Sequence, residues 1–116
     1  MDREAVAEIM SMKVVFAAPL LQAVSVRDCA TIEANAEELR KLSLSTAFAV
    51  SDTVAYRALS ESFRRDVTAL AEAARARDHV AAEAAYLRVA ASCFSCHHHV
   101  REERATGNLP GRLTMR

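Results

Sequence analysis

The chain has 116 residues, of which 52% are hydrophobic but only 5% aromatic, and its 15 basic and 15 acidic side chains balance. This length suits one domain with its own hydrophobic core. The charge balance excludes the basic excess typical of proteins that bind nucleic acid or anionic membranes. No run of about 20 apolar residues is present, so we expect no transmembrane helix.

Glycine and proline are scarce. The two glycines are Gly107 and Gly111, and the two prolines are Pro19 and Pro110. A β-sheet of this size would need several tight turns, which favour these residues. The sequence therefore predicts an all-α fold.

The first helix is expected from about Asp2 to Val24. Its apolar residues recur at the three-and-four spacing of a buried stripe: Val6, Ile9, Met10, Ala17, Leu20, Leu21 and Val24. Pro19 lies inside this helix and cannot donate a hydrogen bond to Val15, so we expect a bend there.

The second helix is expected to begin with an N-cap at Asp28 and to end near Leu44. Its inner stripe consists of Ile32, Ala36, Leu39 and Leu42. The following segment, Ser43 to Asp52, is rich in serine and threonine and is expected to form a loop.

Asp52 is expected to cap a third helix that ends near Arg77. Its inward residues are Leu59, Phe63, Val67 and Leu70. Asp78 is expected to cap a fourth helix that reaches about Arg104, and Gly107 is its natural terminator. Residues 1–107 then form one domain, followed by a tail of residues 108–116. Short connections predict an antiparallel up-down-up-down four-helix bundle.

The motif that carries chemistry is Cys-x-x-Cys-His, formed by Cys93, Cys96 and His97. Two thiols three residues apart lie on one face of a helix. They can form thioethers with the two vinyl groups of a haem, while His97 binds the iron, which makes this a c-type haem attachment motif.

Three other interpretations of the motif stay open, and the simplest is a pair of buried cysteines in the core of a structural helical bundle. The thiols and His97 could bind zinc, although a fourth ligand is needed and His79 is a poor candidate. The thiols could also form a redox disulfide, but such motifs follow a strand, and no strand is predicted. His98 and His99 point about 100 and 200 degrees further round the helix and are expected to be solvated or at the rim.

The chain resembles the class II cytochromes c, the family of cytochrome c prime and its low-spin relatives. The resemblance rests on the motif in the last helix with Arg101 four residues after His97, on the alanine-rich segment 28–43, and on the run from Arg3 to Met10 followed by Pro19. It covers roughly residues 3–104. It implies one covalent haem c held by Cys93 and Cys96, with His97 as the proximal iron ligand.

The resemblance also implies which residues lie on the side of the haem opposite His97. By spacing from Arg3, the family's iron-facing position on the first helix falls on Ala7, and Met10 shares that face one turn later. Met10 is a candidate distal ligand; the alternative is five-coordinate iron below a small pocket roofed by Ala7 and Met10, which would admit diatomic gases. Arg3 resembles an arginine that pairs with a haem propionate, and Phe48 is expected at the haem edge or in the core.

The expected function is a periplasmic carrier of single electrons, a binder of nitric oxide or carbon monoxide, or both. We find no convincing catalytic acid or base, so no enzymatic turnover is expected. The expected partners are redox proteins, and a homodimer through the first helix is suggested by a weak second apolar stripe: Ala5, Met12, Phe16 and Pro19. Cys29 is expected to be a buried thiol at a helix start.

The N-terminus does not show a charged leader followed by an apolar segment, which a signal peptide needs. Haem attachment to this motif takes place outside the cytoplasm. We therefore expect the sequence to be a mature domain recloned behind a start methionine.

Overall fold

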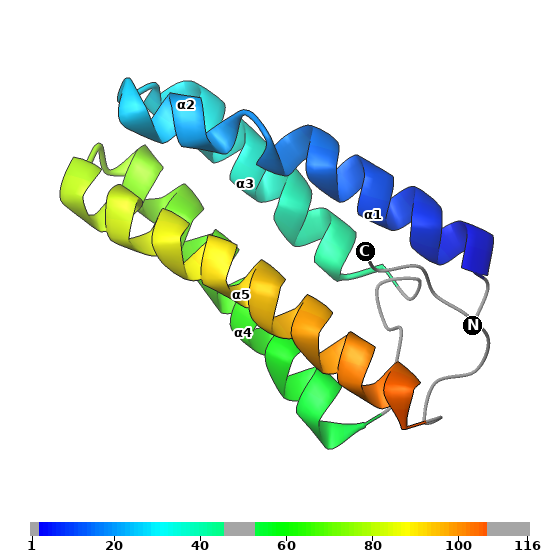
Figure 1. Ribbon diagram of the computed structural model, residues 1–116. Coiled ribbons are helices and arrows are strands. Elements are labelled where there is room, and N and C mark those ends of the chain that lie inside the picture. Colours follow the sequence, from blue (N-terminus) through cyan, green and yellow to red (C-terminus); the bar gives the residue numbers. More distant parts are fainter. Residues whose placement is uncertain (1–2, 46–52, 107–116) are drawn as a thin grey trace.

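The computed structural model describes residues 3–45 and 53–106, and within these ranges every regular element is a helix. The helices are α1 (Arg3–Ala17), α2 (Leu20–Ser25), α3 (Cys29–Ser43), α4 (Val54–Arg75) and α5 (His79–Ala105). Because α2 continues the course of α1 beyond a bend, four helical arms pack together (Figure 1). The all-α prediction is confirmed. No described helix is long and apolar enough to cross a membrane.

The bend predicted at Pro19 is present. The helix is interrupted at Ala18 and Pro19, and its hydrogen bonding resumes when the Ala23 N–H donates to the Pro19 carbonyl at 3.0 Å. Beyond the bend, α2 buries Leu20, Ala23 and Val24. Leu21 is consequently turned outward and is 61% exposed, so its predicted place in the buried stripe was wrong.

Two turns of the same design close one end of the molecule. The turns 26–28 and 76–78 join α2 to α3 and α4 to α5, and they lie at the same end of the bundle (Figure 1). In each turn an arginine takes positive φ, 61° at Arg27 and 56° at Arg77. The next N–H, of Asp28 or Asp78, donates back into the preceding helix at 2.8 or 2.9 Å. This is the Schellman arrangement, which normally uses glycine at the positive-φ position.

The aspartate after each arginine caps the next helix. The Asp28 carboxylate accepts from the Thr31 N–H, and the Asp78 carboxylate accepts from the Ala81 N–H, as predicted. The third predicted cap was wrong. Thr53 replaces Asp52, because α4 begins one residue later and the Thr53 hydroxyl accepts from the Tyr56 N–H.

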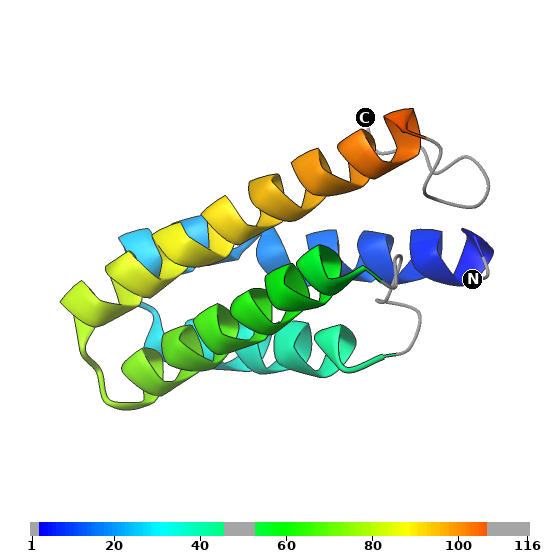
Figure 2. The same cartoon turned by 90° about the horizontal axis from the view of Figure 1, so that it is seen from below.

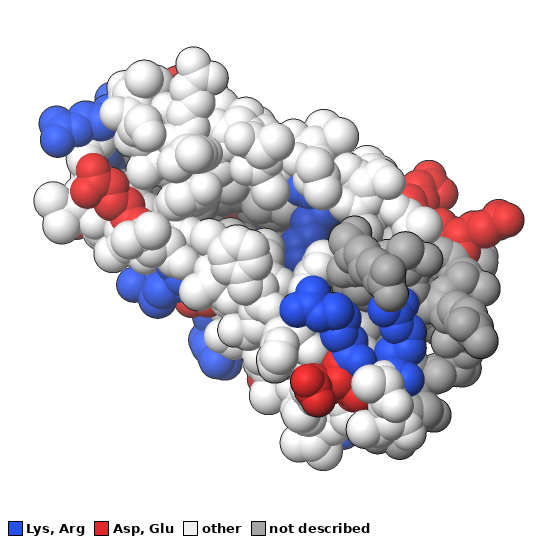
Figure 3. Space-filling model, in the orientation of Figure 1, with Lys and Arg blue, Asp and Glu red and all other residues white. Residues whose placement is uncertain are grey.

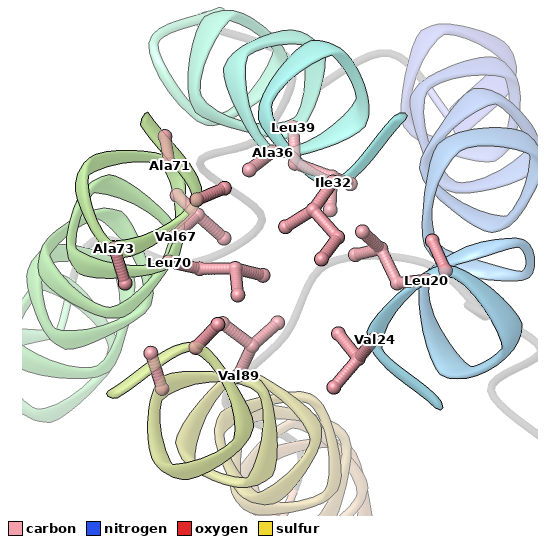
Figure 4. Packing of buried hydrophobic residues seen from close by; sticks show 14 of the residues in the cluster. Leu20, Val24, Ile32, Ala36, Leu39, Val67, Leu70, Ala71, Ala73 and Val89 are labelled. Carbon is pink, nitrogen blue, oxygen red and sulfur yellow. The ribbon is translucent and has the colours of Figure 1, made fainter. Parts of the chain in front are cut away.

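The main core lies between α2, α3, α4 and α5. Its labelled side chains point toward one another across the bundle (Figure 4). The predicted stripes of α3 and α4 supply buried residues of this core: Ile32, Ala36, Leu39, Phe63, Val67 and Leu70. Leu42 and Leu59, also predicted to face inward, are half-buried. Burying one such aliphatic side chain contributes about 1.5–3 kcal/mol.

The other end of the bundle is less tightly closed. Helices α1 and α5 diverge toward the chain termini in both ribbon views (Figures 1 and 2). There α1 packs chiefly on α3, whereas α4 packs on both α3 and α5. A smaller cluster forms at this end from Val6, Tyr56, Cys96 and Val100, with Met10 against it.

We expect Arg77→Gly to raise the free energy of unfolding by about 1 kcal/mol, because glycine relieves the steric cost of a side chain at positive φ. Urea denaturation followed by circular dichroism measures this change. The control is Arg65→Gly in the middle of α4, which should lower stability by about 1 kcal/mol. A loss of stability in both variants would contradict the assigned turn.

Candidate functional site

The site is built on α5, which runs without interruption through the Cys-x-x-Cys-His motif. Each residue advances about 100 degrees round a helix, so Cys93, Cys96 and His97 fall within an arc of roughly 100 degrees. All three cysteines of the chain are free thiols. The helix alone therefore presents two thiols and one imidazole on a common face.

The two thiols lie at the boundary between the two apolar clusters. Cys93 is half-buried and packs against the main core, while Cys96 is 6% exposed and belongs to the smaller cluster with Val6 and Tyr56. Burial raises the pKa of the Cys96 thiol, and the charge of Lys13 and a hydrogen bond from Tyr56 partly oppose this rise. Helices α1, α4 and α5 thus meet at Cys96.

His97 is half-buried beside the thiols. Burial is the main cause that lowers its pKa from the usual value, and the positive charges of Lys13 and Arg101 act in the same direction. The neutral imidazole that results is the form that binds metal ions.

The next two histidines have other neighbours. His98 is exposed, and its Nε2 lies 3.9 Å from Glu102 Oε1. The Nε2 of half-buried His99 lies 2.6 Å from Oε1 of the buried Glu103, and this oxygen accepts a hydrogen bond from the Thr53 hydroxyl. Both are therefore turned away from the face that carries the thiols and His97.

A residue of the candidate site that sequence reasoning missed is Lys13. It is 5% exposed, and its Nζ lies 4.3 Å from the centre of the Phe63 ring on α4. Its position gave a signal, because it follows Val6 by seven residues and Met10 by three and so continues their stripe on α1. A stripe defined by apolar residues alone leaves this lysine out.

The surface between α1 and α5 is hollowed. Figure 3 shows this hollow, with atoms of basic side chains at its floor. Among the described residues, Lys13 is the one buried lysine or arginine. The hollow lies where the two helices diverge, on the side of the molecule shown in Figures 1 and 3.

The structure brings some of the other predicted residues to this place and not others. Met10 is half-buried and packs against both clusters. Ala7 is exposed, because Val6, Met10 and Lys13 form the inward face of α1, so it is not brought to the site. Arg3 begins α1, but its side chain is not among those described, and Phe48 lies outside the described residues.

The fourth ligand considered for the zinc interpretation, His79, does not lie beside Cys93, Cys96 and His97. Within the described ranges, no group of three or more His, Cys, Asp or Glu side chains is placed to hold a metal ion. His79 begins α5, 14 residues before Cys93, which is roughly 21 Å along a helix. Its Nδ1 lies instead 3.9 Å from the Sγ of Cys29, which is buried at the start of α3.

Comparison with known proteins adds no family assignment. No protein-family model matches the chain, and searches of curated proteins and of solved structures found no significant match. The functional argument therefore depends on the residues and their geometry.

The different burial of the two motif thiols gives a direct test in protein expressed without haem attachment. Iodoacetamide at pH 8 should alkylate Cys96 in a C29S/C93S variant about tenfold more slowly than Cys93 in a C29S/C96S variant. The reason is that the thiolate is the reactive form and Cys96 is both buried and raised in pKa. The alkylation rates are measured by mass spectrometry. Equal rates in the two variants would contradict the contacts assigned to Cys96.

Proposed function

We propose that the chain is a c-type haem protein of the class II cytochrome kind, which carries single electrons, binds nitric oxide or carbon monoxide, or does both, in the periplasm. The observation that carries this proposal is the placement of Cys93, Cys96 and His97 on one face of an unbroken helix. The proposal includes the antiparallel up-down-up-down order of the four arms, which the two three-residue turns support.

The surroundings of the motif fit a haem. The thiols are free, and the lowered pKa of His97 favours the neutral imidazole. One face of α4 carries Tyr56 and Phe63, and between them lies the buried Ser60, whose Oγ has no hydrogen-bond partner among the described residues. Because buried hydroxyls are rarely left unpaired, this orphaned atom is consistent with a missing group between α1, α4 and α5.

In this proposal Cys93 and Cys96 hold the haem through thioethers and His97 binds its iron. The bound haem supplies one-electron and diatomic-ligand chemistry. The chain would contribute an apolar enclosure formed by Val6, Met10, Tyr56 and Val100. Met10 on α1 would be the distal ligand, and the alternative is an open distal position. Propionate pairing by Arg3 and a haem-edge contact by Phe48 remain part of the proposal.

The proposal is tested by coexpression with haem-attachment machinery. The purified protein should show haem absorption that survives denaturation, because thioethers are covalent. The C93S/C96S variant should lose this covalent haem, whereas C29S, the matched control for loss of a buried cysteine, should retain it. A colourless wild-type protein that binds zinc or forms a Cys93–Cys96 disulfide would support the alternative of a zinc or dithiol module.

The spectrum of the reduced protein separates the two roles of the haem. Narrow split bands that do not move under carbon monoxide would indicate six-coordinate iron and an electron carrier, and Met10→Leu should then open the site. A broad high-spin spectrum that shifts under carbon monoxide would indicate an open site and a gas binder.

The proposal also includes a homodimer through the first helix. Phe16 of the predicted outer stripe packs on the main core, but Val14 and Val15 are 64% and 65% exposed beside the exposed Met12. Burying these side chains between two copies would be favourable.

Light scattering at micromolar concentration should therefore give twice the 12.7 kDa monomer mass for the wild type and the monomer mass for Val14→Glu. The control is Val80→Glu, which alters an equally exposed valine on α5 and should leave the dimer intact. A monomeric wild type would contradict the dimer.

A further inference from the structure

The buried Lys13 carries a positive charge into the interior between α1 and α4. A charged side chain is rarely buried unless its surroundings stabilise it, because removal from water is costly. Its Nζ lies 4.3 Å from the centre of the Phe63 ring, within the range of a cation–π contact. The ring of Phe63 is itself buried in the main core, so the contact fixes the lysine against α4.

Lys13 lies close to the clusters that contain or contact the motif thiols on α5. Lys13 continues the α1 stripe of Val6 and Met10, and both of these residues pack against the cluster that contains Cys96. Phe63, whose ring meets the Lys13 ammonium group, belongs to the main core against which Cys93 packs. The cation is therefore held between α1 and α4, beside the two clusters to which the thiols of Cys93 and Cys96 belong.

We propose that Lys13 sets the charge preference of the haem site, favouring the reduced iron and anionic ligands over the oxidised iron and neutral ligands. This inference rests on the proposed haem attachment to Cys93 and Cys96. The physical reason is Coulombic: a fixed positive charge disfavours the additional positive charge of ferric iron and attracts a bound anion. An apolar residue at position 13 would give neither effect.

The size of the effect can be estimated. Two unit charges roughly 10 Å apart at an effective dielectric constant of about 20 change an equilibrium constant by somewhat more than tenfold. For a one-electron couple, a tenfold change corresponds to about 59 mV. This size is well within the resolution of a redox titration.

The experiment compares haem-loaded wild type, Lys13→Met and Lys13→Arg. Methionine removes the charge and keeps the length of the side chain, whereas arginine retains the charge. The control Lys41→Met removes an exposed lysine on α3. The midpoint potential is measured by redox titration, together with the affinity of the ferric protein for azide, an anion at pH 7, and of the ferrous protein for neutral carbon monoxide.

The expected result is a midpoint potential about 59 mV lower in Lys13→Met, with Lys13→Arg and Lys41→Met close to the wild type. Azide affinity should fall about tenfold in Lys13→Met, while carbon monoxide affinity should change less than twofold. If Lys13→Met does not load haem, Lys13→Gln supplies the same comparison.

The outcomes separate this inference from the proposed function. A wild type without covalent haem would overturn both. A loaded wild type whose potential is unchanged in Lys13→Met would overturn the role of Lys13 alone. A spectrum that changes from low-spin to high-spin in Lys13→Met would show that the lysine binds the iron, and this too would overturn a role in charge preference.

Discussion

The uninterrupted hydrogen-bond ladder of α5 is the constraint on which the site depends. A helix turns by a constant angle at each residue, so three side chains at positions 93, 96 and 97 share a face without help from any loop. A loop would need many additional contacts to hold two thiols and an imidazole in such register. The two thiols and the imidazole thus project from one rigid helix, and residues of the other helices form their surroundings.

The two ends of the bundle differ in how tightly their helices pack. At one end, the turns around Arg27 and Arg77 reverse the chain within three residues and draw the helices together over the main core. At the other end, α1 and α5 diverge, and the smaller cluster leaves a hollow between them (Figure 3). The well-packed end can hold the four arms in place while the other end packs less tightly, since protein stability is not uniform through a structure.

The α1 stripe shows how a charged residue can belong to an interior face. Val6, Met10 and Lys13 are separated by helical spacing, and the long aliphatic stem of the lysine packs where an apolar side chain would also fit. Its ammonium group then meets the Phe63 ring. The inward face of α1 thus carries one positive charge among apolar side chains.

Local rules were sufficient for much of this protein. The scarcity of glycine and the periodic apolar residues predict the helices. The caps at Asp28 and Asp78, the bend at Pro19 and the shared face of the motif could also be predicted, because each depends on interactions within a few residues. The exposure of Leu21 and Ala7 and the burial of Lys13 could not be obtained in this way. They depend on how α1 and α2 rotate against α3, α4 and α5 after the bend, and that rotation is set by packing between helices distant in sequence.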